Sequence, residues 1–359
     1  MRIITIIGAR PQFIKAAIVS YAIRQHNAQS SIQIEERILH TGQHYDHNMS
    51  QVFFDQMQIP APTWHLACND QTVEQMRDAI VPIIDQHADY ILLYGDTNST
   101  LAGALAATQC NIPIIHIEAG LRSFNPQMAE EHNRIETDKR STLLFCPTYT
   151  AVANLQREGI TKGIYMVGDV MYDASLLFTE QASKTSDILS RLNLTPRQYL
   201  LATIHRAETT CDVEKVANIL RAFAQIPYPV ILPLHPRTRK VVAASEMLTD
   251  LAHANNIHII ESVSYVDMQW LEEQALCILT DSGGVQKEAY FHRVPCITMR
   301  EETEWVETIE TGWNTLVGAD TQKIVSAFQN LSIPSTIITE YGDGKASTKI
   351  IEILCQNAC

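Results

Sequence analysis

The sequence predicts an α/β fold built from two doubly wound, Rossmann-like domains. Short apolar runs alternate with amphipathic segments along the whole chain. Such continuous apolar runs are typical of parallel strands buried on both faces of a sheet. Twelve runs are too many for one ordinary open sheet, and they divide into two sets of six. Alternation of strands and helices then favours two doubly wound sheets.

The expected strands follow from these runs. In the first half they are Ile3–Ile7, Ile34–Leu39, Tyr90–Tyr94, Ile112–Ile117, Leu143–Cys146 and Ile164–Val167. In the second half they are Tyr199–Ile204, Val230–Leu234, Ile257–Ile260, Leu276–Thr280, Pro295–Met299 and Thr315–Val317. Helical spacing is clear in Lys15–Ile23, Leu101–Thr108, Val213–Ala224 and Gln322–Gln329. The poorly periodic stretch Gln181–Arg197 is expected to carry the crossover between the halves.

Length and composition agree with a two-domain cytoplasmic protein. The chain has 359 residues, and about 150 residues per domain suggests two domains. Its 27 basic and 40 acidic residues give a net charge of −13, which argues against binding nucleic acid or a membrane surface. No apolar stretch is long enough to predict a membrane-spanning helix. The eight cysteines form no CxxC pair, so we expect reduced thiols.

Two turns are candidates for binding a phosphate-containing ligand. In open α/β sheets the ligand lies beyond the carboxyl ends of the strands. Arg10 and Lys15 follow the first strand near a helix N-terminus, which attracts anions. After the run ending at Thr280, Ser282-Gly283-Gly284 allows backbone N–H groups to approach a pyrophosphate, and Glu288 can accept hydrogen bonds from ribose hydroxyls. No GxGxxG fingerprint occurs, so NAD is disfavoured and no cofactor is expected.

Acidic turns follow strands of the first half and supply candidate proton-transfer groups. They are Gly95–Thr100, His116–Arg122 and Glu130–Arg134, with Asp96, Glu118 and Glu130 as the candidate acid/base residues. Carboxylates at strand ends suit general acid/base chemistry if one of them is held protonated. The alternative is that they cap helices and form ion pairs with Arg122 or Arg134.

Basic turns end two strands of the second half. His205-Arg206 follows one strand, and His235-Pro236-Arg237-Thr238-Arg239 follows another. Such turns can stabilise a leaving phosphate by charge, or they can be solvated strand ends.

A metal site is disfavoured. His40-x3-His44-x2-His47 has a spacing possible for zinc, but it crosses a strand end and its turn and lacks the HExxH pattern.

Several long motifs occur in the order seen in one family. They are GARPQFIK, YGDTNSTLAG, HIEAGLRS, EEHNR, the His205-Arg206 turn, LHPRTR and TDSGGVQKEA. In these motifs the chain resembles the non-hydrolysing UDP-N-acetylglucosamine 2-epimerases over nearly its whole length. GARPQF, LPLHPRTR and MREETEWVE are most similar to the branch that acts on UDP-2,3-diacetamido-2,3-dideoxyglucuronic acid.

The resemblance implies a fold of the glycosyltransferase-B type, with two domains facing a cleft. We expect residues 1–172 to carry the catalytic carboxylates, completed by a C-terminal helix over 345–359, and residues 173–344 to bind UDP. The implied reaction inverts C2 of the sugar by eliminating and re-adding UDP, without NAD or metal. It also implies a homodimer that makes precursors of surface polysaccharides.

The resemblance also implies roles for individual residues. Asp96, Glu118 and Glu130 would be the acid/base groups, and Arg10, Lys15 and His205 would handle the leaving diphosphate. The residues that would hold UDP or the substrate are Arg206, Ser282, Gly283, Gly284, Glu288 and Trp305.

One departure from the family concerns the sugar. Trp305 stands where many members have an arginine near the sugar diphosphate. Together with the extra arginines Arg237 and Arg239, this suggests a sugar other than N-acetylglucosamine, one that carries a carboxylate.

Two other functions remain alternatives. A UDP-sugar-dependent glycosyltransferase would use the same fold and the same UDP-binding groups. A catalytically inactive UDP-sugar sensor is a third interpretation, although binding alone would not need Asp96, Glu118, Glu130 and His205 together.

Overall fold

The computed structural model describes residues 1–43, 54, 57–84, 88–234 and 236–357, apart from the side chains of residues 10, 236 and 237. The chain divides into two compact units. Unit 1 comprises Met1–Ala174 and Thr339–Cys359, and unit 2 comprises Ser175–Ile338. The division falls inside one helix, α7 (Val170–Thr185). None of the helices in the described part of the chain is both long enough and apolar enough to cross a membrane.

The described part of unit 1 contains a parallel seven-stranded sheet with the order β3-β2-β1-β4-β5-β6-β7. Its strands are β1 (Arg2–Ile7), β2 (Glu35–His40), β3 (Trp64–His65), β4 (Tyr90–Tyr94), β5 (Ile114–Ile117), β6 (Leu143–Cys146) and β7 (Ile164–Met166). Its helices, besides the first turns of α7, are α1 (Arg10–Gln29), α3 (Val73–Ile84), α4 (Asn98–Gln109), α5 (Ala129–Arg140), α6 (Tyr149–Arg157) and α17 (Ala346–Asn357). The strand order reverses between β1 and β4.

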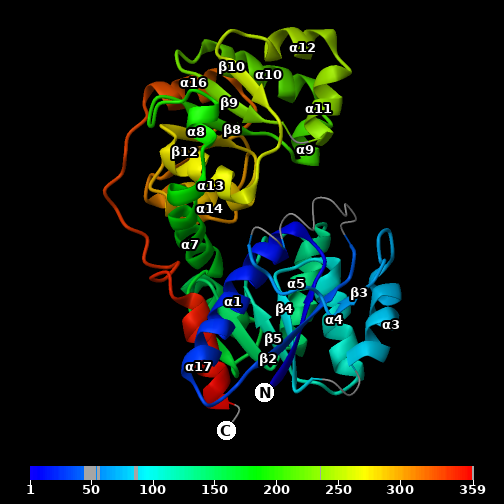
Figure 1. The fold of residues 1–359 in the computed structure, drawn as a ribbon. Helices are drawn as coiled ribbons and strands as arrows, with labels where there is room; N and C mark the ends of the chain where they lie inside the picture. Colours follow the sequence, from blue (N-terminus) through cyan, green and yellow to red (C-terminus); the bar gives the residue numbers. More distant parts are fainter. Residues whose placement is uncertain (44–53, 55–56, 85–87, 235, 358–359) are drawn as a thin grey trace. The chain divides into compact units, whose positions relative to one another are not determined.

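Helices cover both faces of this sheet. On one face, α3 and α4 bury apolar side chains against β1 and β4. On the other, the first and last helices of the described chain, α1 and α17, lie side by side in one layer (Figure 1). The sheet is therefore doubly wound, and its strands are buried from both sides.

The described part of unit 2 contains a parallel six-stranded sheet with the order β10-β9-β8-β11-β12-β13. Its strands are β8 (Leu200–Thr203), β9 (Val230–Pro233), β10 (Ile257–Ile260), β11 (Cys277–Thr280), β12 (Cys296–Thr298) and β13 (Asn314–Leu316). Its helices, besides the rest of α7, are α8 (Ile188–Arg191), α9 (Ala207–Thr210), α10 (Val213–Gln225), α11 (Pro236–Ala243), α12 (Glu246–Ala252), α13 (Tyr265–Gln274), α14 (Gly283–Phe291), α15 (Val306–Glu310) and α16 (Thr321–Gln329). The strand order reverses between β8 and β11.

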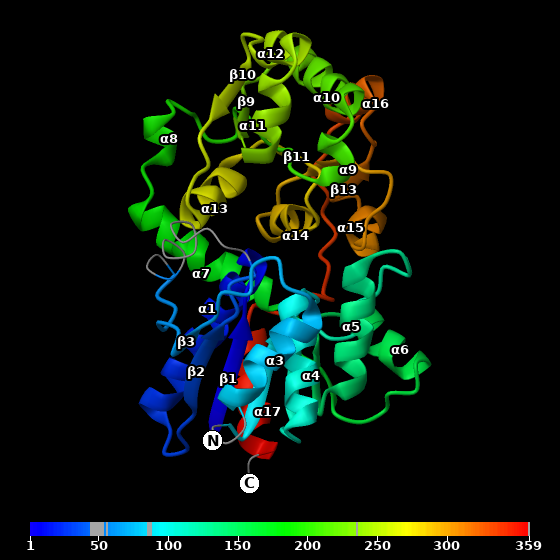
Figure 2. The same ribbon diagram turned by 90° about the vertical axis from the view of Figure 1, so that its right-hand side faces the viewer.

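Two apolar clusters lie on the faces of the second sheet. One contains side chains of α10, α12 and α16, and the other contains side chains of α8, α13 and α14. Figure 2 shows these helices distributed around the sheet strands of this unit. This unit is also doubly wound.

Each of the twelve predicted strands coincides with a strand of the structure. The prediction missed β3, because a two-residue edge strand has no apolar run to reveal it. The stretch 181–197 contains the end of α7 and the short α8, and the division between the units falls earlier, at Ala174. The helix runs through the division without a loop, which is why no change of composition marks it.

The last helix, α17, is fixed to unit 1 by one buried carboxylate. Asp173 accepts hydrogen bonds from the backbone N–H groups of Ala346 (3.0 Å) and Ser347 (2.7 Å), and from the Ser347 hydroxyl (2.7 Å). The first backbone N–H groups of a helix have no partner within it, so Asp173 satisfies donors that would otherwise be buried without one.

We expect Asp173→Ala to lower the free energy of unfolding by about 2 kcal/mol, because it removes a helix cap and leaves buried donors unsatisfied. Urea denaturation would measure the loss. The matched control is Glu352→Ala, which removes an exposed carboxylate on the same helix and should change the free energy by less than about 0.5 kcal/mol. Equal effects of the two substitutions would contradict the role of Asp173.

Candidate active site

Several of the predicted site residues follow the strands at which the strand order of each sheet reverses, and Glu118 follows the next strand of the sheet. In unit 1, Lys15 follows β1, Asp96 follows β4 and Glu118 follows β5. In unit 2, His205 follows β8 and Ser282 follows β11. Reversal leaves room above the carboxyl ends of the two central strands, so turns there can contact a ligand. Each sheet thus presents one set of candidate groups.

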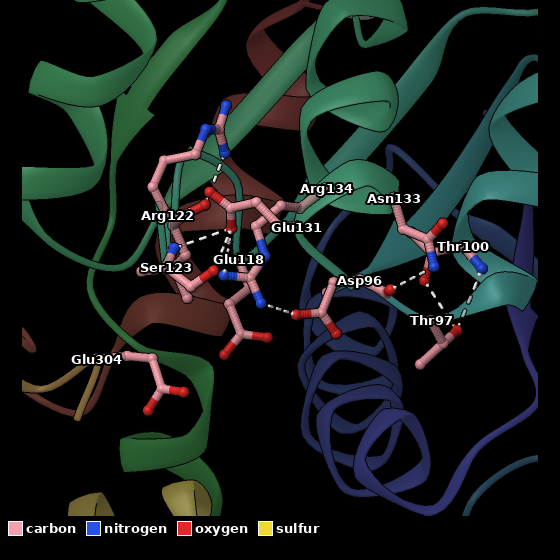
Figure 3. Close-up of polar contacts among 12 residues, drawn as sticks. Asp96, Thr97, Thr100, Glu118, Arg122, Ser123, Glu131, Asn133, Arg134 and Glu304 are labelled. Atoms are coloured by element: carbon pink, nitrogen blue, oxygen red, sulfur yellow. Dashed lines mark hydrogen bonds and ion pairs between the residues drawn. The ribbon is translucent and has the colours of Figure 1, made fainter. Parts of the chain in front are cut away.

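Asp96 is held by two neighbouring residues of α5. Its carboxylate forms an ion pair with Arg134. The side-chain amide of Asn133 donates to the backbone carbonyl of Asp96 over 3.0 Å. Thr97 begins α4 by accepting a hydrogen bond from the Thr100 N–H over 3.2 Å. These contacts fix both the backbone and the side chain of Asp96 (Figure 3).

Glu118 forms an ion pair with Lys15, and both side chains are nearly buried. Its backbone has a φ of +72°, which is rare for a residue other than glycine and is often found at functional sites. The backbone N–H groups of Glu118 and Ala119 both donate to the Phe145 carbonyl over 3.1 Å, which holds this conformation. The chain thus retains a strained glutamate at this strand end.

Asp96 and Glu118 belong to one charged cluster. The positive charge of Arg134 acts on both carboxylates. A Cβ atom at Gly95, which has a φ of +62°, would lie 3.1 Å from a Glu118 carboxylate oxygen and 3.3 Å from Lys15 Nζ. Figure 3 shows Asp96, Glu118 and Arg134 beside one another. The ion pair with Arg134, which the sequence offered as an alternative to an acid/base role, is therefore present: Arg134 pairs with Asp96.

The two glutamates at the start of α5 differ in their surroundings. Glu130 is exposed, and its side chain has no hydrogen bond or ion pair to any other described residue. Glu131 is buried and accepts from the Ser123 N–H (2.8 Å), the Ser123 hydroxyl (2.9 Å), the Phe124 N–H (3.0 Å) and Arg134 (3.2 Å). Glu131 therefore orders the loop before α5. The structure does not bring Glu130 into contact with Asp96 or Glu118.

The turn after β1 is packed tightly against two other turns. A Cβ atom at Gly8 would lie 2.0 Å from the Thr41 hydroxyl oxygen and 2.3 Å from that of Ser99, so only glycine fits. The side-chain oxygen of Gln12 accepts from the backbone N–H groups of Gly8 (2.8 Å) and Ala9 (3.0 Å). This turn leads to Lys15. The side chain of Arg10 lies outside the described part of the chain.

In unit 2, His205 is positioned by Asp281. The fully buried Asp281 carboxylate accepts from the backbone N–H groups of His205 and Arg206, each over 3.1 Å, and lies 3.3 Å from His205 Nδ1. Burial alone would raise the pKa of Asp281, but the His205 ring and these N–H groups outweigh it and hold that pKa below its usual value. Asp281 orients the Nδ1 side of the ring. The sequence did not predict that Asp281 binds His205, although Asp281 stands next to the candidate residue Ser282.

The N-terminus of α14 presents an open backbone. A Cβ atom at Gly284 would have only the Ser282 hydroxyl within 4.0 Å, and one at Gly283 would make only ordinary contacts of 3.7 Å or more. Packing within the protein does not require glycine at either position. Because Gly283 and Gly284 have no side chains, their backbone N–H groups are accessible to an anionic ligand.

Glu288 lies one turn further along α14 in a buried polar cluster. Its Oε1 accepts from the Tyr265 hydroxyl (2.9 Å) and the Gln269 side-chain amide (3.2 Å). The same amide donates to Glu272 over 3.0 Å. Burial, and next the charge of Glu272, raise the pKa of Glu288 to about 8. Sequence analysis missed Tyr265, Gln269 and Glu272, because they lie on α13, far from Glu288 in sequence.

Trp305 lies beside the same helix start. Its ring stacks under the Lys287 ammonium at 4.0 Å, a cation–π contact. The neighbouring Arg300 and Glu304 form a two-bond ion pair of 3.2 and 3.3 Å. A Cβ atom at Gly283 would lie 3.8 Å from the indole nitrogen. Trp305 thus stands next to the predicted pyrophosphate turn.

The remaining predicted residues are the arginines after β9 and the histidines of the possible zinc motif. Arg239 forms an exposed ion pair with Glu261 over 2.9 Å. The side chain of Arg237 lies outside the described part, as do residues 44 and 47 of the histidine motif. Among the residues that the structure describes, no group of three or more His, Cys, Asp or Glu is placed to hold a metal ion.

Comparison with known proteins identifies the family. The model of a family described as UDP-N-acetylglucosamine 2-epimerase matches residues 26–355. A Methanococcus maripaludis protein named as a UDP-N-acetylglucosamine 2-epimerase homolog is 47% identical over 99% of both chains. The UDP-2,3-diacetamido-2,3-dideoxy-D-glucuronate 2-epimerase of Pseudomonas aeruginosa is 45% identical, over 99% of this chain and 100% of the relative.

A solved structure extends the comparison to the fold. The Methanocaldococcus jannaschii UDP-GlcNAc 2-epimerase, in complex with UDP-GlcNAc and UDP, has a TM-score of 0.86 and 36% identity, and the match covers 99% of this chain and 100% of that one. The predicted two-domain α/β fold of the glycosyltransferase-B type is confirmed, and a glycosyltransferase activity is not favoured. The chain belongs to the UDP-N-acetylglucosamine 2-epimerase family, whose members are isomerases of UDP-sugars.

Proposed function

We propose that this protein inverts C2 of a UDP-N-acetylhexosamine by eliminating UDP and adding it back. The observation that carries this proposal is the pair of carboxylates, Asp96 and Glu118, at the ends of neighbouring strands, each paired with a cation. Inversion requires a base on one face of the sugar and an acid on the other. Two carboxylates in one charged cluster supply both functions if they carry one proton between them.

The reaction balances without an added oxidant or reductant. One carboxylate takes the C2 proton, and the electron pair of that C–H bond forms a C1=C2 double bond as the C1–O bond breaks. UDP leaves with the electron pair of the C1–O bond. In the second half, the other carboxylate protonates C2 from the opposite face, and a UDP oxygen attacks C1. The C2 proton has no adjacent carbonyl to acidify it, so stabilising departing UDP is essential.

Cations and N–H groups of both units are assigned to the nucleotide. We assign Arg10, Lys15 and His205 to the departing diphosphate. Gly283 and Gly284 offer backbone N–H groups at the start of α14. The N–H of Ser282 donates to the Thr280 hydroxyl, so Ser282 is assigned through its side-chain hydroxyl. Arg206 is assigned through its positive charge, which acts on Glu304. Glu288 is assigned to the ribose hydroxyls. Supporting this assignment, Tyr265 and Gln269 hold one of its oxygens in place.

Glu130 remains a third acid/base candidate. Its position in the first turn of α5 is three residues before Asn133, which contacts Asp96. Its exposed side chain gives it weaker support than Asp96 and Glu118 have, because each of those carboxylates forms an ion pair in the charged cluster.

We further propose that the sugar carries a carboxylate, as in the compound that names the Pseudomonas aeruginosa relative. The 45% identity to that relative over 99% of this chain supports a carboxylated sugar. Trp305, where the family resemblance places an arginine, supports a sugar other than N-acetylglucosamine, because it changes the side chain beside the predicted pyrophosphate turn. We also expect a homodimer that serves the synthesis of surface polysaccharide precursors.

The acid/base assignment predicts the effect of removing each carboxylate. Asp96→Asn and Glu118→Gln should each lower kcat by about 10²–10⁴-fold while changing the Kd for UDP little, because proton transfer acts only in the transition state. Epimerisation assays and calorimetry with UDP would measure both. Glu136→Gln, the same substitution on a surface position of α5, serves as the control and should leave kcat unchanged. Full activity in Asp96→Asn or Glu118→Gln would refute the assignment.

The surroundings of Glu288 predict how UDP binding depends on pH. A carboxylate accepts hydrogen bonds from ribose hydroxyls best when it is ionised. A pKa of about 8 leaves Glu288 mostly protonated at neutral pH. UDP affinity should therefore rise by roughly 5- to 10-fold between pH 7 and 8.5 and level off above the pKa. The ionisable groups acting on Glu288 are Glu272, Tyr265, His292 and Lys287. Calorimetric Kd values for UDP across this range would test it, and Glu288→Gln should flatten the pH dependence.

The substrate proposal predicts a preference. UDP-2,3-diacetamido-2,3-dideoxyglucuronate should be turned over with a higher kcat/KM than UDP-N-acetylglucosamine. Trp305→Arg should shift this ratio toward UDP-N-acetylglucosamine. Parallel assays of wild type and variant by NMR would measure both ratios. Equal or better use of UDP-N-acetylglucosamine by the wild type would reject the proposal.

A further inference from the structure

The buried histidine of β5, His116, contacts three parts of unit 1 that carry the candidate acid/base groups. It stands two residues before Glu118, and its side chain is fully buried. Its Nε2 lies 2.8 Å from the Gly95 carbonyl oxygen, next to Asp96. Its Nδ1 lies 2.7 Å from Asp138 Oδ1, on α5.

The partners of His116 determine which atoms donate. A carbonyl oxygen can only accept, so Nε2 carries a hydrogen and donates it to Gly95. A proton also lies between Nδ1 and Asp138, since two lone pairs at 2.7 Å would repel each other. The ring therefore forms a hydrogen bond at each end, and neither end can rotate away without leaving a buried polar group unsatisfied.

Asp138 extends this connection to the chain after Glu118. Its second oxygen accepts from the Gly120 N–H (3.1 Å) and from Arg122 (2.8 Å). Arg122 is held in turn by two hydrogen bonds to Glu158, of 2.6 and 2.7 Å. Asp138 thus fixes the backbone two residues beyond the strained Glu118, while His116 lies two residues before it.

Gly95 is held from two sides. Its N–H donates to the Ile117 carbonyl over 3.0 Å, and its carbonyl accepts from His116. Because its φ is +62°, the peptide after Gly95 directs Asp96 away from the line of β4. The same histidine therefore sets the backbone that carries Asp96 and, through Asp138, the turn that carries Glu118.

We propose that His116 is a positioning residue that sets the spacing of Asp96 and Glu118 through its Nε2–H bond to Gly95, with Asp138 holding the ring. This inference rests on the proposed roles of those two carboxylates. Displacing one carboxylate by about 1 Å costs on the order of 100-fold in rate. It also delays protonation of the enzyme-held glycal, so a larger share of glycal and UDP should escape before UDP is added back.

A matched pair of amides separates the two ends of the ring. The side-chain nitrogen of glutamine lies as many bonds from Cα as Nε2 of histidine, and that of asparagine as many as Nδ1. His116→Gln therefore keeps a donor for Gly95, whereas His116→Asn keeps a donor for Asp138 and loses the bond to Gly95. Both variants place a neutral amide in the same buried position, so a general effect on packing should be similar in the two.

We expect His116→Asn to lower kcat by about 100-fold and to release several times more free glycal and UDP per turnover than the wild type, with KM little changed. His116→Gln should stay within about tenfold of wild-type kcat with a near-normal glycal share. Thermal unfolding, KM, kcat and glycal release by NMR would be measured on all proteins. Equal kcat and equal glycal release in the two variants, or wild-type behaviour of His116→Asn, would overturn the proposal.

A second variant covers the case in which His116→Asn does not fold. Asp138→Asn preserves side-chain volume and removes the ionic partner of the ring. We expect about tenfold lower kcat and increased glycal release, and wild-type values of both would overturn the proposal. The wild-type enzyme, assayed alongside, distinguishes the proposed epimerase function from the role of His116. If the wild type shows no epimerisation, it is the proposed function that fails.

Discussion

In each unit a buried carboxylate binds the turns that carry the candidate site residues. Asp138 in unit 1 and Asp281 in unit 2 are both almost fully excluded from solvent, and each contacts the Nδ1 atom of a histidine. A charge so placed is costly unless several donors satisfy it, and the donors come from the neighbouring strand ends. In both units, one buried carboxylate needs several hydrogen-bond donors. The turns that supply these donors are therefore held in one conformation.

The same constraint explains where backbone strain is tolerated. Glu118 adopts a left-handed conformation that costs about 1–3 kcal/mol, and the surrounding hydrogen bonds maintain it. The Phe145 carbonyl accepts from both Glu118 and Ala119, and Asp138 anchors Gly120. Although the chain has a net charge of −13, Lys15 and Arg134 each form an ion pair with one of the candidate acid/base carboxylates.

The strands could be predicted from sequence, but the contacts that support the candidate site residues could not. Apolar runs identify buried strands because their signal is local, and a strand of two residues such as β3 gives none. Asp138 and Asp281 act on partners 22 and 76 residues away, so no spacing reveals them. Adjacent glutamates posed a similar difficulty: only the structure distinguishes exposed Glu130 from buried Glu131.

The return of α17 to unit 1 has a consequence for synthesis on the ribosome. Unit 2 is one continuous segment, Ser175–Ile338, whereas unit 1 needs both Met1–Ala174 and Thr339–Cys359. While unit 2 is being translated, the surface of α1 that α17 later covers has no helix against it, and Asp173 has no helix end to bind. Unit 2 can complete its core as it emerges, but unit 1 reaches its native packing only after α17 has left the ribosome. During that interval the uncovered apolar face is available to chaperones and to other nascent chains.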